Sequence, residues 1–364
     1  MKTTFLYILL FILFACVHSK PVSHKHHVLP AAELKPTGRT ALHSDKGLEL
    51  ISSAAHFEFS FEGKECSLFI SIPPWLDHNY IQYTIDGEYQ GRLRIDNKNT
   101  LPVVIQADKN GRHEVVIYKA TEAHTGAVYI EKILAKGIQP IQPASLPLIE
   151  FIGNSITCGA AADTSDIPCG KGVYHDQHNA YLAYGPRLSR ALGAQYILSS
   201  VSGIGVYRNW NSDGPAMPVV YERSGFNHQD PGWDFEKYTP DIVSMALGTN
   251  DLSNGGGVRP RLSFDSAQFV HEYLKFIQKV RSIYPSAKIA LLSSPMIKGS
   301  KRLLLQNCLS TIRILAEKNS GIRISTFFFK PMEAGGCTGH PSVNDHAVMA
   351  KELYPFFKEL LNNH

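Results

Sequence analysis

The chain has 364 residues, of which 44% are hydrophobic and 19% are charged, and its formal net charge is +4. This composition is that of an ordinary globular protein and excludes a disordered or fibrous chain, and the length allows two domains with separate cores. Lys and Arg are spread along the sequence without forming a block. We therefore expect no nucleic-acid partner.

The N-terminus has the three parts of a secretory signal peptide. Met1-Lys2 precedes an apolar run from Phe5 to Val17, and His18-Ser19 follows it. The run is too short for a transmembrane helix, so we assign residues 1–19 to a signal peptide and expect a secreted or periplasmic protein without a membrane span. One alternative stays open, because Leu13 to Cys16 also resembles a loose lipoprotein signal, with Cys16 as the lipid anchor of an outer-membrane protein.

Residues 20–47 are interpreted as a flexible leader. They include a basic, histidine-rich segment, Ser23 to His27. Such a segment is compatible with weak metal binding, but it is more typical of a solvated, mobile chain.

An odd number of cysteines follows Cys16, so at least one of them is free in an exported protein. They are Cys66, Cys158, Cys169, Cys308 and Cys337. Three possibilities stay open: Cys158 bonded to Cys169, Cys158 bonded to Cys337, or simple buried thiols.

Residues 48–144 show the period-two hydrophobic pattern of β-strands. Examples of such segments are His56–Phe61, Ser67–Ile72 and Tyr80–Ile85, and turn signals between segments include Asp86-Gly87 and Asn110-Gly111. Many short strands at this spacing predict an all-β sandwich domain of jelly-roll type. The prolines between residues 138 and 144 indicate an extended linker, which places the domain boundary after residue 144.

Residues 145–364 alternate apolar strands with helical segments. The predicted strands are Leu148–Ile152, Gln195–Ser199, Ile242–Leu247, Lys288–Ser293 and Ile322–Phe328, and the clearest predicted helices are Phe264–Ile283 and Lys301–Lys318. This alternation predicts a three-layer α/β domain with a parallel, doubly wound sheet.

Glycines and polar residues follow several of these strands. The segments are Gly153-Asn154-Ser155 after the first strand, Ser202-Gly203 after the second, Gly248 to Asp251 after the third, and Gly339-His340-Pro341 after the last. The carboxyl ends of parallel strands meet at one edge of the sheet, where open α/β folds bind their ligands. We therefore expect the four segments to form one site.

Ser155 and His340 are the residue types that acyl-transfer chemistry needs. A serine hydroxyl is a poor nucleophile until a base removes its proton, and histidine, with a pKa near 6.5, serves as that base at neutral pH. The backbone N–H groups of Ser155 and Gly203 and the side-chain amide of Asn250 are the predicted donors to an oxyanion. Taken singly, each residue also has a structural interpretation, as a helix cap, a turn glycine or an Asx turn.

In this order and spacing, the segments around Ser155, Gly203, Asn250 and His340 resemble the sequence blocks of the SGNH hydrolase superfamily, the GDSL-type esterases. The resemblance implies a serine nucleophile, glycine and asparagine oxyanion donors, and a histidine base at these four positions. It also implies a flavodoxin-like SGNH domain over residues 145–364.

A β-sandwich ahead of such a domain makes the chain most similar to carbohydrate esterase family 2. The matching motifs are Gly153 to Gly159 and Gly336 to Ser342. The resemblance implies an acetyl esterase that acts on plant cell-wall polysaccharides such as xylan and glucomannan, often at O-6 of a hexopyranosyl unit.

The third triad residue of the superfamily lies three positions before the histidine, and this position is Cys337 here. A neutral thiol cannot replace a carboxylate beside an imidazolium. We therefore predict a Ser155–His340 dyad, and the resemblance to family 2 implies a histidine oriented by a backbone carbonyl. Asp251 and Asp345 stay as possible orienting acids. A role in fixing its own loop suits Asp251 better, and a role in starting or capping the last helix suits Asp345 better. A Cys337→Ala variant is expected to keep most activity.

Aromatic residues on the predicted site loops are candidates for stacking on sugar rings, and we assign Trp210 and Trp233 to the pocket rim. The leading prediction is a secreted, monomeric carbohydrate O-acetyl esterase that needs no metal or organic cofactor, since the motifs lack paired ligands at zinc spacing. Two alternatives stay open. One is an esterase for lipid or other small esters with the same residues, and the other is a non-catalytic glycan-binding protein.

Overall fold

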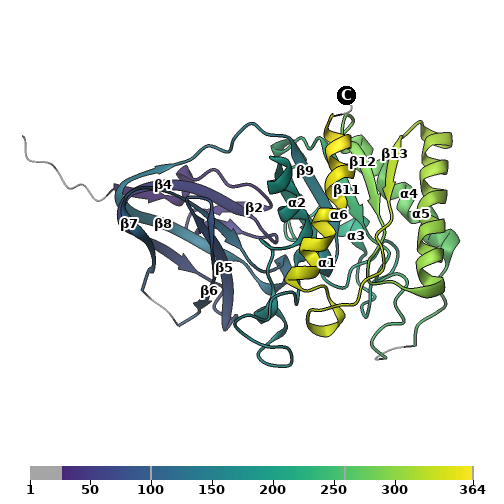
Figure 1. The fold of residues 1–364 in the computed structure, drawn as a ribbon, viewed down its shortest axis with the longest axis horizontal. Helices are drawn as coiled ribbons and strands as arrows, with labels where there is room; N and C mark the ends of the chain where they lie inside the picture. The colour runs from purple at the N-terminus through teal and green to yellow at the C-terminus, as the bar shows by residue number, and fades with distance from the viewer. Residues whose placement is uncertain (1–26, 99–100, 258–259, 363–364) are drawn as a thin grey trace, which may run out of the picture.

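The computed structural model describes residues 27–98, 101–257 and 260–362, which form two domains lying side by side (Figure 1). The predicted signal peptide, the alternative lipid anchor at Cys16 and residues 20–26 of the leader lie outside this range. Within the described residues, no helix has the length and apolar character needed to cross a membrane.

The N-terminal domain, called the β-domain below, is antiparallel and all-β, as predicted. Its strands pair in the order β2-β3-β8-β4-β7-β5-β6, and β1 also pairs with β8. The strands are β1 His27–Pro30, β2 Thr40–His43, β3 Gly47–Leu50, β4 His56–Ser71, β5 His78–Ile85, β6 Glu88–Asp96, β7 Val103–Lys119 and β8 Val128–Pro140, with short helices η1 Ala31–Glu33 and η2 Ala123–Thr125. Leu48 of β3 and Ile95 of β6 share one buried core, although β6 ends the strand order and β3 lies next to its other end. One curled sheet therefore encloses the core that a sandwich holds between two sheets.

Two strands of the β-domain are longer than predicted. β4 has 16 residues and β7 has 17, and Asn110-Gly111, predicted as a turn, lies inside β7. Gly111 pairs with Gly63 of β4, and the register shifts directly after Gly63, whose φ is 121°. A bulge at a glycine lets paired strands bend without ending, so a turn-like sequence can continue a strand.

The prediction of a flexible leader over residues 20–47 is wrong for its described part. β1 and β2 lie in that part and pair with β8 and β3. Arg39 is fully buried, and its guanidinium donates to the carbonyl oxygens of Tyr221, at 2.8 Å, and Arg223. A buried cation needs such partners. Because these acceptors belong to the second domain, the segment is ordered and connects the two domains.

The second domain, called the α/β domain below, has a five-stranded parallel sheet in the order β10-β9-β11-β12-β13, as predicted. The strands are β9 Leu148–Gly153, β10 Gln195–Ser200, β11 Ile242–Ala246, β12 Lys288–Leu292 and β13 Ile324–Phe327. The helices are α1 Ser155–Cys158, α2 Tyr184–Leu192, α3 Met217–Val220, α4 Ser266–Ile283, α5 Gly299–Ser320 and α6 Val343–Asn362, with η3 Tyr174–Gln177, η4 Phe235–Lys237 and η5 Cys337–Gly339. α2 and α6 pack on one face of the sheet and α4 and α5 on the other, which gives the three predicted layers (Figure 1).

The strand order places β9 between β10 and β11, so the chain leaves the first strand in one direction and later returns on its other side. Such a reversal opens a crevice at the carboxyl ends of the strands. All six residues of β9 are buried, up to Gly153. The segment that follows, with Ser155, is therefore delivered directly into this crevice.

Candidate active site

Ser155 is held at the start of α1, directly after β9. Asn154 is the N-cap residue of this helix, and its side chain accepts a hydrogen bond from the Ile156 N–H at 3.1 Å. Asn154 thus caps the helix, and the Ser155 hydroxyl is left for other contacts. A Cβ atom on Gly153 would lie 2.0 Å from Thr157 Oγ1, so strand and helix meet at a spacing that only glycine permits.

His340 lies beside Ser155, with its Nε2 atom 2.9 Å from the serine Oγ. On the other side of the ring, Nδ1 lies 3.3 Å from the Cys337 carbonyl oxygen and 3.1 Å from Thr338 Oγ1. A proton on Nδ1 leaves Nε2 with the lone pair that accepts the Ser155 hydroxyl proton. Burial is the largest influence on this imidazole and lowers the pKa of His340 below its ordinary value, which favours the neutral ring.

Neither candidate orienting acid has a hydrogen bond with His340 among the described residues. Asp251 accepts hydrogen bonds from the backbone N–H groups of residues 206–208, so it fixes the loop after β10 rather than its own loop. Asp345 accepts the Ser342 N–H at 2.8 Å, at the start of α6. The acceptors that face Nδ1 are therefore the backbone carbonyl and the hydroxyl described above.

Gly203 and Asn250 follow β10 and β11 and face the same cavity as Ser155. Gly203 has φ of 76°, in the left-handed region that favours glycine, and its carbonyl accepts the Trp210 N–H at 2.7 Å. The Asn250 side-chain nitrogen donates to the Ile204 carbonyl at 2.7 Å. An amide nitrogen carries two protons, so this contact orients Asn250 and leaves its second proton for a ligand.

A cavity of about 600 Å³ joins these groups. The four predicted residues Ser155, Gly203, Asn250 and His340 all line it, together with the side chains of Tyr174, Trp210 and Met296 among others. Trp210 is 45% exposed, so its ring is open to a ligand. The structure therefore brings the predicted polar residues together and places one of the two predicted tryptophans at their rim.

Trp233, the other tryptophan, does not line this cavity. It is only 9% exposed, its ring stacks on Tyr238 with centroids 6.3 Å apart, and it lies 5.0 Å from the guanidinium carbon of Arg39. The prediction that Trp233 lies on the pocket rim is therefore wrong. Its ring instead covers a buried cation that crosses between the domains.

Thr338, Met296 and Ser253 also line the cavity, although none of them was predicted as a site residue. Thr338 has φ of 53°, an uncommon conformation for a β-branched residue, and its hydroxyl faces His340. Its place two residues before the predicted base is a signal that identifies it as a candidate. Met296 follows β12, so the rule that sites gather at strand ends also applies to it.

The disulfide joins Cys169 to Cys337, and neither pairing considered from the sequence occurs. Cys158 lies inside α1 with its sulfur 3.1 Å from Ser200 Oγ, and it is a buried free thiol, as are Cys66 and Cys308. The bond ties the loop before η3 to η5. The residue that supplies the backbone acceptor for His340 is therefore covalently anchored.

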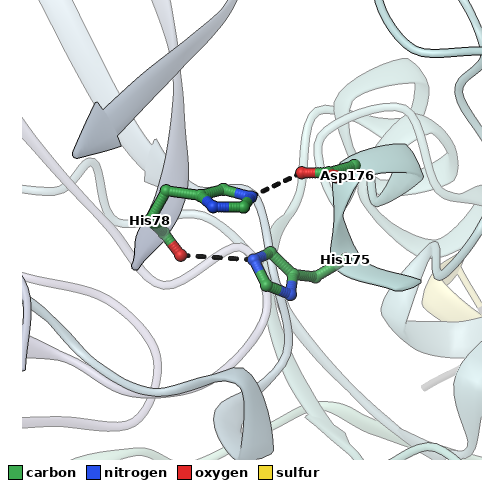
Figure 2. A group of neighbouring side chains, drawn as sticks. All are labelled: His78, His175 and Asp176. Carbon is green, nitrogen blue, oxygen red and sulfur yellow. Dashed lines mark hydrogen bonds and ion pairs between the residues drawn. The ribbon is translucent and has the colours of Figure 1, made fainter. Parts of the chain in front are cut away.

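Outside this cavity, His78, His175 and Asp176 place three potential metal ligand atoms within 4.8 Å of one another. Figure 2 shows that these groups bind each other: His78 Nε2 lies 2.6 Å from Asp176 Oδ1, and His175 Nε2 lies 3.2 Å from the His78 carbonyl oxygen. The Tyr80 hydroxyl also donates to Asp176, at 2.8 Å. We assign this cluster to the hydrogen-bonded contact between β5 and η3 across the domain boundary.

The geometry around Ser155 suits attack on a carbonyl carbon. A neutral imidazole at hydrogen-bond distance activates a hydroxyl, and fixed amide donors nearby stabilise the oxyanion that such an attack creates.

Models of two protein families match the chain in succession. The N-terminal domain model of carbohydrate esterase 2 matches residues 36–144, and the GDSL-like lipase/acylhydrolase model matches residues 151–322. The first match begins inside the segment interpreted from the sequence as a leader, in agreement with the ordered strands found there.

Two relatives and one solved structure extend this likeness over both domains. The chain is 26% identical over 366 residues to an acetylxylan esterase/glucomannan deacetylase of Cellvibrio japonicus, covering 97% of this chain and 96% of that protein. It is 29% identical over 339 residues to the cellulase/esterase CelE of Acetivibrio thermocellus, covering 89% of this chain but 39% of that longer protein. A family two carbohydrate esterase from Clostridium thermocellum, solved in complex with cellohexaose, has a TM-score of 0.79 and 26% identity, covering 90% of this chain and 99% of that one. The chain therefore belongs to the SGNH/GDSL hydrolases, is most like carbohydrate esterase family 2, and is a carboxylic ester hydrolase.

Proposed function

We propose that this protein is a secreted carbohydrate O-acetyl esterase that removes acetyl groups from plant cell-wall polysaccharides such as xylan and glucomannan. The observation that carries the proposal is the 2.9 Å contact between Ser155 Oγ and His340 Nε2 in a cavity that Gly203 and Asn250 also line. The named activity of the Cellvibrio japonicus relative supports the choice of substrate.

In the acylation step, the Ser155 oxygen attacks the acetyl carbonyl carbon while its proton moves to His340 Nε2. The carbonyl oxygen becomes an oxyanion, and the N–H groups of Ser155 and Gly203 and the free amide proton of Asn250 are the donors proposed to stabilise it. His340 then gives the proton to the sugar oxygen, the carbon–oxygen bond breaks, and the deacetylated glycan leaves an acetyl group on Ser155.

In the deacylation step, His340 removes a proton from water, and the water oxygen attacks the acetyl carbon. The tetrahedral intermediate collapses, the proton returns from His340 to Ser155 Oγ, and acetic acid leaves and ionises to acetate in water. The Cys337 carbonyl stands where a carboxylate is more usual, and it orients the ring by accepting from Nδ1. The cycle uses proton transfers among Ser155, His340 and water, so it draws on no metal or organic cofactor.

The walls of the cavity support a sugar substrate. The half-exposed Trp210 and the Tyr174 ring flank the dyad, and aromatic faces at such positions stack on the apolar faces of sugars. The Cys169–Cys337 disulfide supports export, because such bonds persist mainly in oxidising compartments. Anchoring through Cys16 stays an alternative to free secretion.

The test is acetate release from acetylated xylan, acetylated glucomannan, a short-chain aryl acetate and a long-chain lipid ester, each measured with the wild type and with Ser155→Ala. The expected result is release from at least one polysaccharide by the wild type, with a loss of about 10³-fold or more in the variant. Hydrolysis of the lipid ester alone would instead favour the lipid esterase. Glycan binding without acetate release from any substrate would favour the binding protein.

A further inference from the structure

Glu122 is a buried carboxylate of the β-domain that reaches the proposed active site. It follows β7 and precedes η2, and it is 5% exposed. Its Oε2 atom accepts the Ser202 N–H at 2.7 Å and lies 3.7 Å from Cys158 Sγ, and its Oε1 atom lies 3.5 Å from His178 Nε2. One side chain thus contacts the loop after β10 that contains Ser202 and Gly203, the helix that begins with Ser155, and a buried histidine of the α/β domain.

The carboxylate is ionised in this environment. Burial is the largest influence and on its own raises the pKa of Glu122, but the contacts with His178 and Ser202 outweigh it and bring the pKa to about 2. The Ala161 N–H lies 3.4 Å from His178 Nδ1, so Nδ1 is an acceptor and Nε2 carries the proton that faces Glu122. Glu122 therefore accepts the Ser202 N–H, while His178 Nε2 lies close to its other oxygen without forming a hydrogen bond.

The backbone of Glu122 is fixed by the β-domain. The amine of the fully buried Lys119 donates to the carbonyl oxygens of Glu122, at 2.6 Å, and Thr121, at 3.1 Å. The Thr121 hydroxyl in turn donates to Asn79 Oδ1 on β5 at 2.6 Å. The carboxylate is thus attached to a rigid part of the sheet rather than to a mobile loop.

Ser202, whose N–H donates to Glu122, directly precedes Gly203, one of the proposed oxyanion donors. On the far side, the Gly203 carbonyl accepts the Trp210 N–H at 2.7 Å. The loop is therefore held on both sides of the Gly203 N–H. Donors to an oxyanion are effective when they are oriented before the reaction, because no free energy is then spent on turning them during the reaction.

We propose that Glu122 is a positioning residue of the active site, supplied by the β-domain, which orients the Gly203 oxyanion donor by accepting the Ser202 N–H. The proposal rests on the proposed function, since it presupposes an esterase with Ser155 as nucleophile. It makes the β-domain a part of the catalytic apparatus rather than a separate module. The charge of Glu122 also opposes the lowering of the His340 pKa that burial causes, which favours the protonated ring formed during the reaction.

The test compares kcat and KM of Glu122→Ala, Glu122→Gln and the wild type on a soluble aryl acetate, beside thermal unfolding of each protein. Glu122→Ala should lower kcat about 10- to 100-fold while KM stays within about twofold, because the lost orientation matters most in the transition state. Glu122→Gln should give an intermediate loss. A glutamine keeps one oxygen that can accept the Ser202 N–H, but it loses the negative charge and places an NH₂ group near His178 Nε2.

Gln82→Ala is the matched control. Gln82 is also a fully buried side chain of the β-domain that accepts a backbone N–H across the same boundary, that of Tyr181 at 3.0 Å, but it does not line the cavity. We expect it to lower the unfolding temperature with kcat within about twofold of the wild type.

A kcat of Glu122→Ala within threefold of the wild type would overturn the proposal, as would equal kcat losses in Glu122→Ala and Gln82→Ala. If Glu122→Ala does not fold, Glu122→Gln decides alone, and an unchanged kcat in that variant overturns the proposal. An inactive wild type would instead refute the esterase itself, so the two failures are distinguishable.

Discussion

At the residue scale, the proposed chemistry depends on the protonation of one imidazole. His340 contacts Ser155 through Nε2, and a backbone carbonyl rather than a carboxylate faces its Nδ1 atom. No negative charge in direct contact with the ring raises its pKa, while burial lowers it. The base is therefore neutral, and ready to accept a proton, at a lower pH than an exposed histidine.

This predicts the pH dependence of catalysis. Activity requires the neutral form of His340, so kcat/KM should decline as the pH falls, with the midpoint of the decline below the ordinary histidine value of 6.5. The measurement is kcat/KM on a soluble aryl acetate from pH 4 to 8. A decline centred at or above pH 6.5 would contradict the burial of this base.

Ser155 and His340 were predictable from the sequence because each belongs to a short motif that follows a recognisable strand. The position of the Trp233 ring was not predictable, since the local sequence does not tell whether an aromatic ring faces solvent or a buried cation from another domain. The Cys169–Cys337 pairing was also missed. It joins residues 168 positions apart, and only the packing of two loops brings them together.

At the scale of the elements, the turn from β9 into α1 sets the position of the Ser155 hydroxyl. A Cβ on Gly153 would collide with Thr157 on the first turn of the helix. We therefore expect Gly153→Ala to displace α1 and to lower kcat by roughly 10- to 100-fold, as small displacements of reacting groups do. Gly232→Ala is the control, because a Cβ there meets no atom within 4 Å. Equal kcat values for both variants, measured on folded protein, would refute this role of Gly153.

The disulfide is the second feature that positions the proposed dyad. Removing it in Cys169→Ala/Cys337→Ala should lower the free energy of unfolding by about 3 kcal/mol, because a long loop is no longer closed in the unfolded chain. It should also lower kcat by roughly tenfold, because the backbone acceptor for His340 loses its anchor. Urea unfolding and aryl acetate hydrolysis measure the two effects.

The prediction from the sequence that a Cys337→Ala variant keeps most activity treated Cys337 as a free thiol, and the disulfide found there leads us to expect a loss instead. Cys308→Ala, which removes a buried free thiol, is the control for both measurements. A double variant with the kcat of the wild type would show that the dyad does not depend on the bond.

At the scale of the whole molecule, buried polar side chains of the β-domain join it to the α/β domain, one as a donor and one as an acceptor. Arg39 enters the α/β domain, where its carbonyl acceptors lie, and the Gln82 side chain accepts the Tyr181 N–H. Breaking a buried charged contact typically costs several kcal/mol, since the partners left behind stay desolvated. The interface therefore contributes to the stability of the fold as well as to the site.

Arg39→Met should accordingly lower the free energy of unfolding by about 3 kcal/mol. The exposed Lys35, in the same segment, is the control, and Lys35→Met should stay within about 0.5 kcal/mol of the wild type. Urea unfolding followed by tryptophan fluorescence makes the comparison. Equal stabilities of the two variants would restore the view of this segment as a loose leader.

The parallel sheet and the two-domain order were predictable because hydrophobic periodicity changes from period two to alternating strands and helices near residue 144. The ordered part of the leader was not, because its strands have four residues each and Arg39 has the composition of a surface residue. Its burial depends on acceptors near residue 221, which no local pattern reveals. The same reason hides Glu122, whose carboxylate contacts lie in the other domain.

The most direct test of the Ser155–His340 dyad is a comparison of kcat/KM for acetate release from acetylated xylan or glucomannan by the wild type, Ser155→Ala, His340→Ala and the double variant. Residues that act as one unit give losses that do not add. Each single variant should therefore lose about 10³-fold or more, and the double variant should be no slower than the singles. A Ser155→Ala variant that deacetylates near the wild-type rate, or single losses that multiply in the double variant, would contradict the dyad.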